Sequence, residues 1–289
     1  MNIEKLEQLR IKKYIKYKII LTLAIILFSA TILYFLFMAI CHSMDFIKPF
    51  IYVIMFMTSA LLFYLAKKTS KNFANAVKEV LIDDILVLKF DDFEFDLKSH
   101  ISKKVINEVG IFRKPSRISG EDHLKGRYQN VSFEVSDLKL ERSDGDSTYT
   151  FFEGRWFIFK FNKNFNETIK LIEGSKIGIT INGLSEEETE STVFNKKYRM
   201  YSSNKNFFYK FMTPLMIDKI MNFYEGTKGK VSFALINNEL HIAIYDKTDF
   251  LKIDLKKPLS NKVIDDLKLE LNQIIEIIEK LDLNTDKFN

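Results

Sequence analysis

Glycine, proline and cysteine are scarce in this chain of 289 residues. With only 10 Gly and 4 Pro, the composition excludes collagen-like, linker-rich and low-complexity proteins. The chain has a single cysteine, Cys41, so it can form neither an intramolecular disulfide nor a cysteine-based metal site. This cysteine content fits a reducing compartment.

Two segments near the N-terminus lack charged residues altogether. Residues 19–41 form an uncharged apolar run of 23 residues, and residues 50–66 form a second of 17. A helix needs about 20 apolar residues to cross the hydrocarbon core of a membrane. We therefore expect a transmembrane hairpin within residues 1–71, with helices at about 19–41 and 47–66. Pro49 suits the first turn of the second helix.

Lysine and arginine counts at the helix ends predict the orientation of this hairpin. Six basic residues precede the first helix, and one lies in the short connection. The membrane-flanking basic residues that we expect to matter most are Lys12, Lys13, Lys16, Lys18, Lys67, Lys68 and Lys71. Both termini should face the cytosol of a bacterial cytoplasmic (inner) membrane, with the lipid bilayer as a partner.

A cleaved signal peptide is the alternative for the first run, but the run exceeds the core of about 7–15 residues and no A-x-A site follows it. Neither run contains Asp, Glu, Lys, Arg or His, which argues against an ion or proton pathway. Small residues at 29–31 and 58–60 offer positions for close helix packing.

Charge is divided unevenly along the chain. Residues 1–71 carry ten basic and three acidic residues, whereas the remainder carries 33 basic and 35 acidic residues. A domain that binds a nucleic-acid backbone usually has a basic excess. The near-neutral remainder therefore predicts that nucleic acid is not a partner.

Residues 72–289 are expected to form a cytosolic α+β domain with a mainly antiparallel sheet, dividing into two subdomains, if at all, near 183–196. Helical spacing is present at the start of 72–90 and at 98–110, where Gly110 would end the helix. Further helices are expected at 205–211 and 214–224, with Pro214 at the start of the latter. An amphipathic helix at about 260–281 would close the chain, and its apolar face would dock on the sheet or on a partner helix.

Alternating apolar residues predict the strands. They are expected at 131–140, 149–161, 168–172, 177–181, 198–201, 231–236 and 240–245. Residues 143–146 and Asn237-Asn238 have the composition of hairpin turns. The strand 149–161 has apolar residues on both faces. Phe152, Gly154, Trp156 and Ile158 lie on one face, and Phe151, Phe157, Phe159 and Phe161 lie on the other. We expect it to be central, and Trp156 to be a buried structural residue.

The common catalytic and metal-binding motifs are missing from the sequence. The four histidines have no HxxxH or HExxH spacing, and no Ser lies in GxSxG. The lysine-rich turns at 174–176 and 226–230 lack the P-loop spacing. Asp83-Asp84 and Asp91-Asp92 suit solvated positions better than a metal site, and His241 suits a structural role. We therefore predict no catalytic, cofactor-binding or metal-ligating residues.

Several stretches within about 75–285 share their motifs and their order with a known family. They are Gly120-Glu121-Asp122-His123-Leu124-Lys125-Gly126, Phe152-Glu153-Gly154-Arg155-Trp156-Phe157 running into Phe161-Asn162-Lys163-Asn164-Phe165, Tyr201-Ser202-Ser203, Met212-Thr213-Pro214-Leu215-Met216, Val231-Ser232-Phe233 and Leu240-His241-Ile242-Ala243-Ile244. With these motifs the chain resembles DUF3137, a bacterial family of unknown function. Asn204 departs from the family pattern, which commonly has an acid there. The resemblance implies two N-terminal hydrophobic segments and no established activity. Members of the family are also often encoded near LemA-like membrane proteins, so the resemblance suggests such a protein as a partner.

Three functions are compatible with these features. The leading hypothesis is a non-enzymatic, membrane-anchored interaction or scaffold module. The first alternative is a lipid-binding module with a PH-like sheet, which predicts basic residues on one face of that sheet. The second is an unrecognised enzyme, which requires convergent polar groups in a deep pocket.

Overall fold

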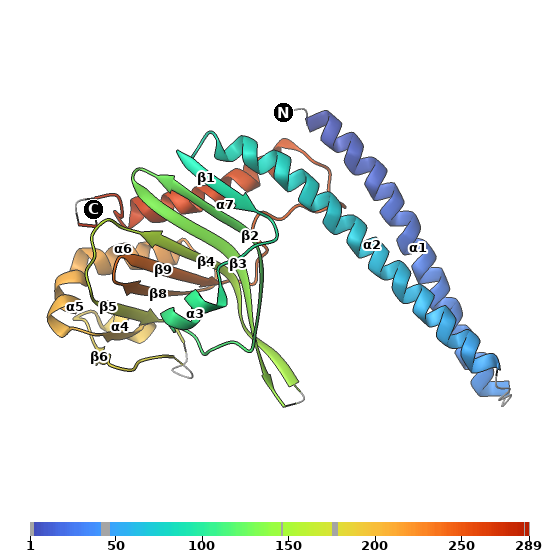
Figure 1. Cartoon of the computed structure of the whole chain (residues 1–289), viewed down its shortest axis with the longest axis horizontal. Helices are drawn as coiled ribbons and strands as arrows, with labels where there is room; N and C mark the ends of the chain where they lie inside the picture. The colour runs from blue at the N-terminus through green and yellow to red at the C-terminus, as the bar shows by residue number, and fades with distance from the viewer. Residues whose placement is uncertain (1–2, 42–46, 146, 175–178, 286, 289) are drawn as a thin grey trace. The chain divides into compact units, whose positions relative to one another are not determined.

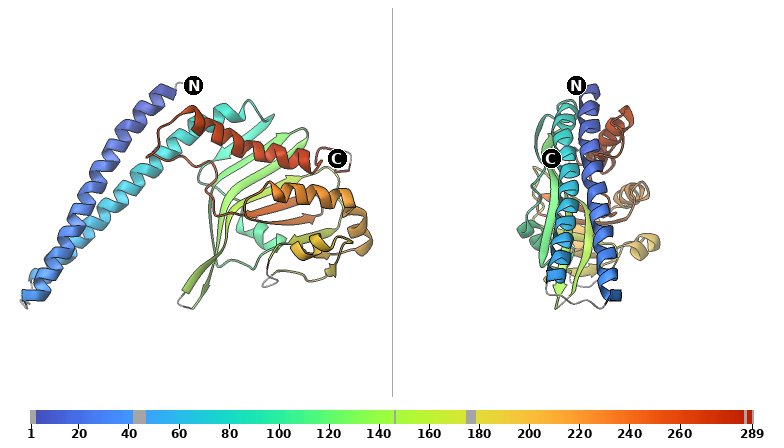
Figure 2. Two further views of the ribbon diagram at one scale, coloured as in Figure 1. Left: turned by 180° about the vertical axis from the view of Figure 1, so that it is seen from behind. Right: turned by 90° about the vertical axis from the view of Figure 1, so that its right-hand side faces the viewer.

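The computed structural model describes residues 3–41, 47–145, 147–174, 179–285 and 287–288. These residues form two compact units, Met1–Ile82 with Lys252–Asp266, and Asp83–Leu251 with Leu267–Asn289. The first unit contains two long helices, α1 (Ile3–Cys41) and the greater part of α2 (Ile47–Leu86). Figure 2 shows these two helices running side by side. Both are long and apolar enough to cross a membrane.

Small residues line the contact between α1 and α2. Ala24 and Thr31 are seven residues apart, as are Ser59 and Ala66, and all four are buried. A spacing of seven keeps one face of a helix against its neighbour, and small side chains let two backbones approach. The Thr31 and Ser59 hydroxyls each donate to a carbonyl of their own helix, at 2.7 Å, so neither hydroxyl is left without a partner in an apolar environment.

Aromatic contacts define the direction of the helix pair. The ring centroids of Phe28 and Phe63 lie 6.1 Å apart, and those of Phe35 and Tyr52 lie 5.4 Å apart. As the residue number rises along α1 it falls along α2, so the helices are antiparallel. Lys18 and Lys67 therefore lie towards the same end of the pair.

A polar contact joins the start of α1 to the segment before α7 (Asn261–Lys280) in the same unit. Arg10 donates two hydrogen bonds of 2.8 Å to the Glu7 carboxylate and one of 3.0 Å to the Leu255 carbonyl. The Leu259 N–H donates to the same carboxylate at 2.8 Å. Residues 255–259 are thereby held against α1 outside the apolar run.

The second unit is built on a nine-stranded sheet in which every pairing is antiparallel (Figure 1). Its spatial order is β1-β2-β3-β4-β9-β8-β5-β7-β6. The strands are β1 (Asp92–Asp96), β2 (Arg117–Tyr128), β3 (Val131–Asp144), β4 (Ser147–Lys160), β5 (Thr168–Ile172), β6 (Ser185–Glu187), β7 (Arg199–Ser202), β8 (Lys230–Ile236) and β9 (Glu239–Tyr245). The predicted α+β fold is confirmed. Strands from both sides of residues 183–196 belong to this one sheet.

Helices cover the two faces of the sheet unequally. One face carries α5 (Lys205–Phe211), α6 (Pro214–Glu225) and the part of α7 from Leu267 onward, as the rear view in Figure 2 shows. The other face carries α3 (Lys103–Val109). The short helix α4 (Thr192–Lys197) precedes β7. Thr213 caps the start of α6, directly before Pro214, and Gly110 ends α3 in the left-handed conformation, as the sequence predicts.

Several predicted boundaries require correction. Helix α3 begins at Lys103 rather than near residue 98, because Ser102 caps it. Residues 179–181 form no strand, and 177–178 lie outside the described residues. The segment 184–191, for which no strand is predicted, contains β6. The turn at 143–146 joins β3 to β4 with Asp144 paired to Ser147, although Asp146 itself lies outside the described residues.

The burial of Trp156 is confirmed, but the face predicted for Phe151 is wrong. Trp156 has no exposed surface and lies with Phe152 and Ile158 in the core beneath α3. A register shift in the pairing of β3 with β4 leaves Phe151 as an extra residue between Thr150 and Phe152. Such a bulge interrupts the alternation of side chains. Phe151 consequently packs near Phe112 on the same side as Phe152.

Candidate functional site

The seven membrane-flanking lysines lie together on the helix pair. Lys12, Lys13, Lys16 and Lys18 are exposed on α1, and Lys67, Lys68 and Lys71 are exposed on α2. Because the helices are antiparallel, both groups lie at the end away from the connection between them. Long basic side chains at this level suit contact with lipid headgroups.

Lys170 is a buried cation that the sequence analysis did not single out. It lies on β5 with 4% of its surface exposed. Its ammonium donates to the carbonyls of Thr180, at 2.8 Å, and Gly110, at 3.4 Å. Burial lowers the pKa of Lys170 to about 8. The side chain ties the end of α3 and the segment at residue 180 to the sheet.

A second buried polar group lies on the opposite face of the sheet, towards α7. Arg155 on β4 donates to Asp246 and to Gln273 of α7. The Leu251 N–H donates to Glu270, also on α7. These bonds fix the loop after β9 and the second half of α7 to the sheet, so they serve the architecture.

Three aspartates converge beside this network. Asp122 occupies a bulge in β2 with φ of 58°, Asp137 lies on β3, and Asp249 lies in the loop after β9. Each can offer a carboxylate oxygen within 4.8 Å of the other two. Carboxylate oxygens are the ligands of hard cations, but acidic clusters also occur without an ion. The three side chains alone assign no metal.

Among these three acids, Asp137 lies in the environment that is least favourable to a negative charge. Its Oδ2 accepts a 2.6 Å hydrogen bond from the Phe250 N–H, whereas its buried Oδ1 has no hydrogen-bond partner among the described residues. Burial raises the pKa of Asp137 to about 8, and the nearby charges of Asp122 and Asp249 act in the same direction. A carboxyl in this environment holds a proton at neutral pH.

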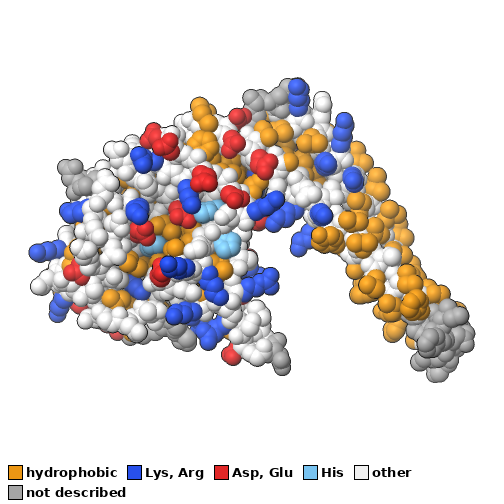
Figure 3. Space-filling view, in the orientation of Figure 1, with side chains coloured by type: hydrophobic (Ala, Val, Ile, Leu, Met, Phe, Trp, Pro, Cys, Tyr) orange, Lys and Arg blue, Asp and Glu red, His pale blue; other side chains and the backbone are white. Residues whose placement is uncertain are grey.

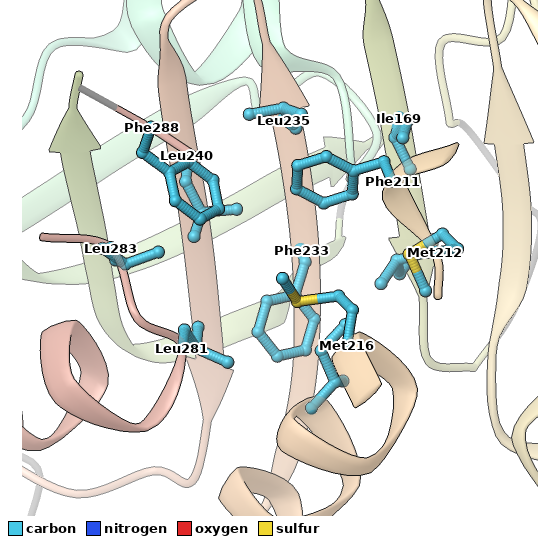
Figure 4. Close-up of a pocket in the computed structure, with 12 residues that line it drawn as sticks. Ile169, Phe211, Met212, Met216, Phe233, Leu235, Leu240, Leu281, Leu283 and Phe288 are labelled. Atoms are coloured by element: carbon cyan, nitrogen blue, oxygen red, sulfur yellow. The ribbon is translucent and has the colours of Figure 1, made fainter. Parts of the chain in front are cut away.

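A small apolar cavity of about 30 Å³ lies between the sheet and α5, α6 and the C-terminal segment. Figure 4 shows the side chains of Phe233, Leu235 and Leu240 from the strands facing Phe211 and Met216 from the helices. Its lining is almost wholly apolar, so it offers no polar group to orient a ligand. It is a packing gap in the core.

A larger cavity of about 190 Å³ lies on the face that carries α3. We name it the α3-face cavity and define it by the residues that line it, which are Ile111, Phe112, Arg113, Phe151, Ile172, Glu173, Gly174, Ile179, Lys230, Ser232 and Tyr245. It combines apolar walls with charged side chains. Its lining comes from segments that are far apart in the sequence, so no local motif signals this cavity.

Among the described residues, the histidines and paired acids considered from the sequence line neither cavity. His241 is buried, and its Nδ1 lies 3.4 Å from the Trp156 indole nitrogen, which supports the predicted structural role. The Nε2 atom of His123 lies 2.6 Å from the Oε1 atom of Glu134. Asp83, Asp84, Asp91 and Asp92 are exposed.

The chain has an α+β fold with two candidate membrane helices. The model of DUF3137, described as a protein of unknown function, matches residues 150–283. The resemblance inferred from the motifs is confirmed over those residues. The match begins within β4 and ends after α7, so the motif from Gly120 to Gly126 lies outside it.

A solved structure has a weak similarity to this chain. It is the crystal structure of the mycobacterial trehalose monomycolate transport factor A, TtfA, with a TM-score of 0.37 and 11% sequence identity. The similarity covers 65% of this chain and 88% of that chain. No curated protein matches the chain.

Proposed function

We propose that this protein is a non-enzymatic interaction module anchored in a bacterial cytoplasmic membrane. The helix pair is the anchor, both termini are cytosolic, and the sheet unit binds another protein. A LemA-like membrane protein is one partner that the family resemblance suggests. The two alternative functions are a lipid-surface binder and an enzyme.

The main observation in support of a membrane anchor is the exposed apolar surface of α1 and α2. Large hydrophobic side chains along both helices are open to solvent, including Leu33, Phe37, Phe50 and Met57, each at least 60% exposed. Soluble monomers rarely expose apolar patches larger than a few hundred Å². Burial in lipid removes this surface from water at a gain of about 25 cal/mol per Å².

The buried polar groups support the non-enzymatic part. Lys170, Arg155 and His241 each have partners within the fold, and these contacts hold elements together. A catalytic site requires polar groups that converge on a space open to substrate. Among the described residues, the aspartates near Asp137 form the closest acidic convergence, and they lie beside the structural network of Arg155.

A reporter fusion tests the topology. A reporter enzyme active only in the cytosol, fused after Asn289, should be active, and one active only outside the membrane should be inactive there. The basic residues flanking both helices provide the physical reason. The matched control inserts the two reporters into the connection between the helices, where the pattern should reverse. Activity of the external reporter at residue 289 would refute the anchor orientation.

One observation favours the lipid-surface alternative. Basic side chains gather around α3, as the blue side chains in that region of Figure 3 show. Five basic residues lie on α3 and between α3 and the start of β2 in the sequence: Lys103, Lys104, Arg113, Lys114 and Arg117. Each basic residue near an anionic membrane contributes about 1 kcal/mol of attraction.

Hydrogen exchange can separate the two functions. The full chain is placed in nanodiscs of neutral lipid and in nanodiscs that contain anionic lipid. An interaction module should show equal amide protection of α3 in both, because its partner is a protein. Stronger protection of α3 in the anionic discs alone, lost in the Lys103→Gln, Lys104→Gln double variant, would favour the lipid-binding alternative.

A further inference from the structure

The α3-face cavity has the size of a small-ligand site. Its volume is about 190 Å³, and an apolar cavity of about 150 Å³ is known to hold benzene. One six-membered ring therefore fits with room for a small substituent. The cavity belongs entirely to the sheet unit, because all its lining residues lie between 111 and 245.

Aromatic side chains form the apolar wall. The bulge at Phe151 places Phe151 and Phe152 on the same side of β4, and their ring centroids lie 6.5 and 5.0 Å from that of Phe112. Tyr245 lies 6.0 Å from Phe152. A regular strand would have turned one of these two phenylalanines to the other face.

Lys170 holds the remaining walls in place. Its ammonium binds the carbonyls of Gly110 and Thr180, which directly precede and follow the lining residues Ile111 and Ile179. The Thr180 N–H also donates to the Gly110 carbonyl at 3.0 Å. A Cβ on Gly110 would lie 2.7 Å from that of Thr180, so this close approach requires glycine. These contacts fix the positions of Ile111 and Ile179 in the wall of the cavity.

Two cations at the cavity have no carboxylate partner within the described part of the chain. Arg113 donates to the Tyr149 hydroxyl and lies over the Tyr149 and Phe151 rings, at 5.6 and 5.9 Å. Lys230 is exposed, with its ammonium near Gly174. The acid in the lining, Glu173, is already engaged, since it accepts from the Val231 N–H at 2.8 Å and pairs with Lys197 at 2.6 Å.

We propose that the α3-face cavity binds a small organic anion that carries one ring-sized apolar group, such as an aryl carboxylate. The ring would occupy the space beside Phe112, Phe151 and Tyr245. The anionic group would accept hydrogen bonds from Arg113, whose planar guanidinium suits a carboxylate, and from Lys230. The stacking of Arg113 on two rings holds its guanidinium in position before a ligand arrives, which lowers the entropy cost of binding.

Three isosteric probes test the charge requirement. 4-Bromobenzoate, 4-bromobenzamide and 4-bromobenzamidine are titrated by calorimetry against the full chain in nanodiscs of neutral lipid. The anion should bind saturably to one site, and the neutral and cationic analogues at least about tenfold more weakly, because a charge-assisted hydrogen bond is lost. Saturable quenching of Trp156 by bromine reports the location, since Phe112 lies 6.0 Å from Trp156.

Matched variants test the residues. Arg113→Gln and Lys230→Gln should each weaken binding of 4-bromobenzoate by about tenfold, whereas Lys228→Gln, an exposed lysine two residues from Lys230, should leave it unchanged. Ile179→Phe should abolish binding by filling the cavity. The melting temperatures of these variants establish that they are folded. Equal affinity for the amide, unchanged affinity of Arg113→Gln, or the absence of saturable binding would each overturn the proposal.

Discussion

Trp156→Ala should lower the melting temperature of the chain by about 10 °C. The side chain has no exposed surface and makes edge-to-face contacts with Phe112 and Phe152, each at 6.0 Å. Removing a buried large aromatic side chain costs about 3–5 kcal/mol. For a unit of this size, each kcal/mol corresponds to about 2–4 °C. The loss is a large part of the 5–15 kcal/mol that stabilises a typical domain.

Scanning calorimetry of the detergent-solubilised chain measures this effect. The control is Leu269→Ala, which truncates a side chain that is 63% exposed on α7 and should change stability by less than about 0.5 kcal/mol. Trp156→Phe should fall between the two, because it keeps a ring but loses the indole N–H that faces His241. Fluorescence of the wild-type tryptophan should be blue-shifted and protected from iodide. Equal melting temperatures for Trp156→Ala and Leu269→Ala would contradict a core position.

The local elements of this fold could be predicted because their signals are short-range. Pro214, Gly110 and Asn237 occupy the helix start, helix end and hairpin turn that their backbone preferences require. The start of α1 and the end of α2 were not predicted correctly, because both helices extend beyond the apolar runs. Residues 3–18 and 67–86 contain neither glycine nor proline, so nothing ends the helices at the apolar boundary. The helices α1 and α2 therefore continue through the charged flanks.

The order of the strands could not be predicted in the same way. β5 pairs with β8 and β7, and β4 pairs with β9, contacts that join residues far apart in the sequence. Only the packing of the whole sheet decides such pairings. The strand β1 was missed because its short sequence, with acids alternating with Phe93 and Phe95, resembles a polar connection.

Both cavity and acidic cluster depend on irregularities that periodicity cannot show. The bulges at Asp122 and Phe151 each add one residue to a strand, and each redirects a side chain that alternation would have placed elsewhere. Asp122 and Asp137 are close in sequence, but Asp249 reaches them only through the fold. The burial of Lys170 could not be predicted, because a lysine between apolar residues in a strand is ordinarily exposed.

Asp137 makes the stability of the chain fall as the pH rises. Its pKa is raised from 3.8 to about 8 in the folded protein, chiefly by burial, with Asp122 and Asp249 adding to the shift and Arg155 opposing it. The folded state therefore retains a proton that the unfolded state has lost between about pH 4 and pH 8. The favourable contribution is complete below pH 4, falls steadily as the pH rises above 4, and is fully lost once the pH has passed through 8. With 1.36 kcal/mol for each unit of pKa, the loss approaches ~5 kcal/mol.

Asp137→Asn should remove this dependence, because the amide stays neutral and its oxygen can still accept from the Phe250 N–H. Melting followed by Trp156 fluorescence, with a chelator present, should give the smaller difference between wild type and variant at pH 5. At pH 8 the melting temperature of the variant relative to wild type should be at least ~5 °C higher than at pH 5, since the wild type loses a few kcal/mol more over that interval. Asp218→Asn, at an exposed position on α6, is the control for the loss of a surface charge. A difference between wild type and Asp137→Asn that is the same at both pH values would mean that this carboxyl is ionised in the folded chain.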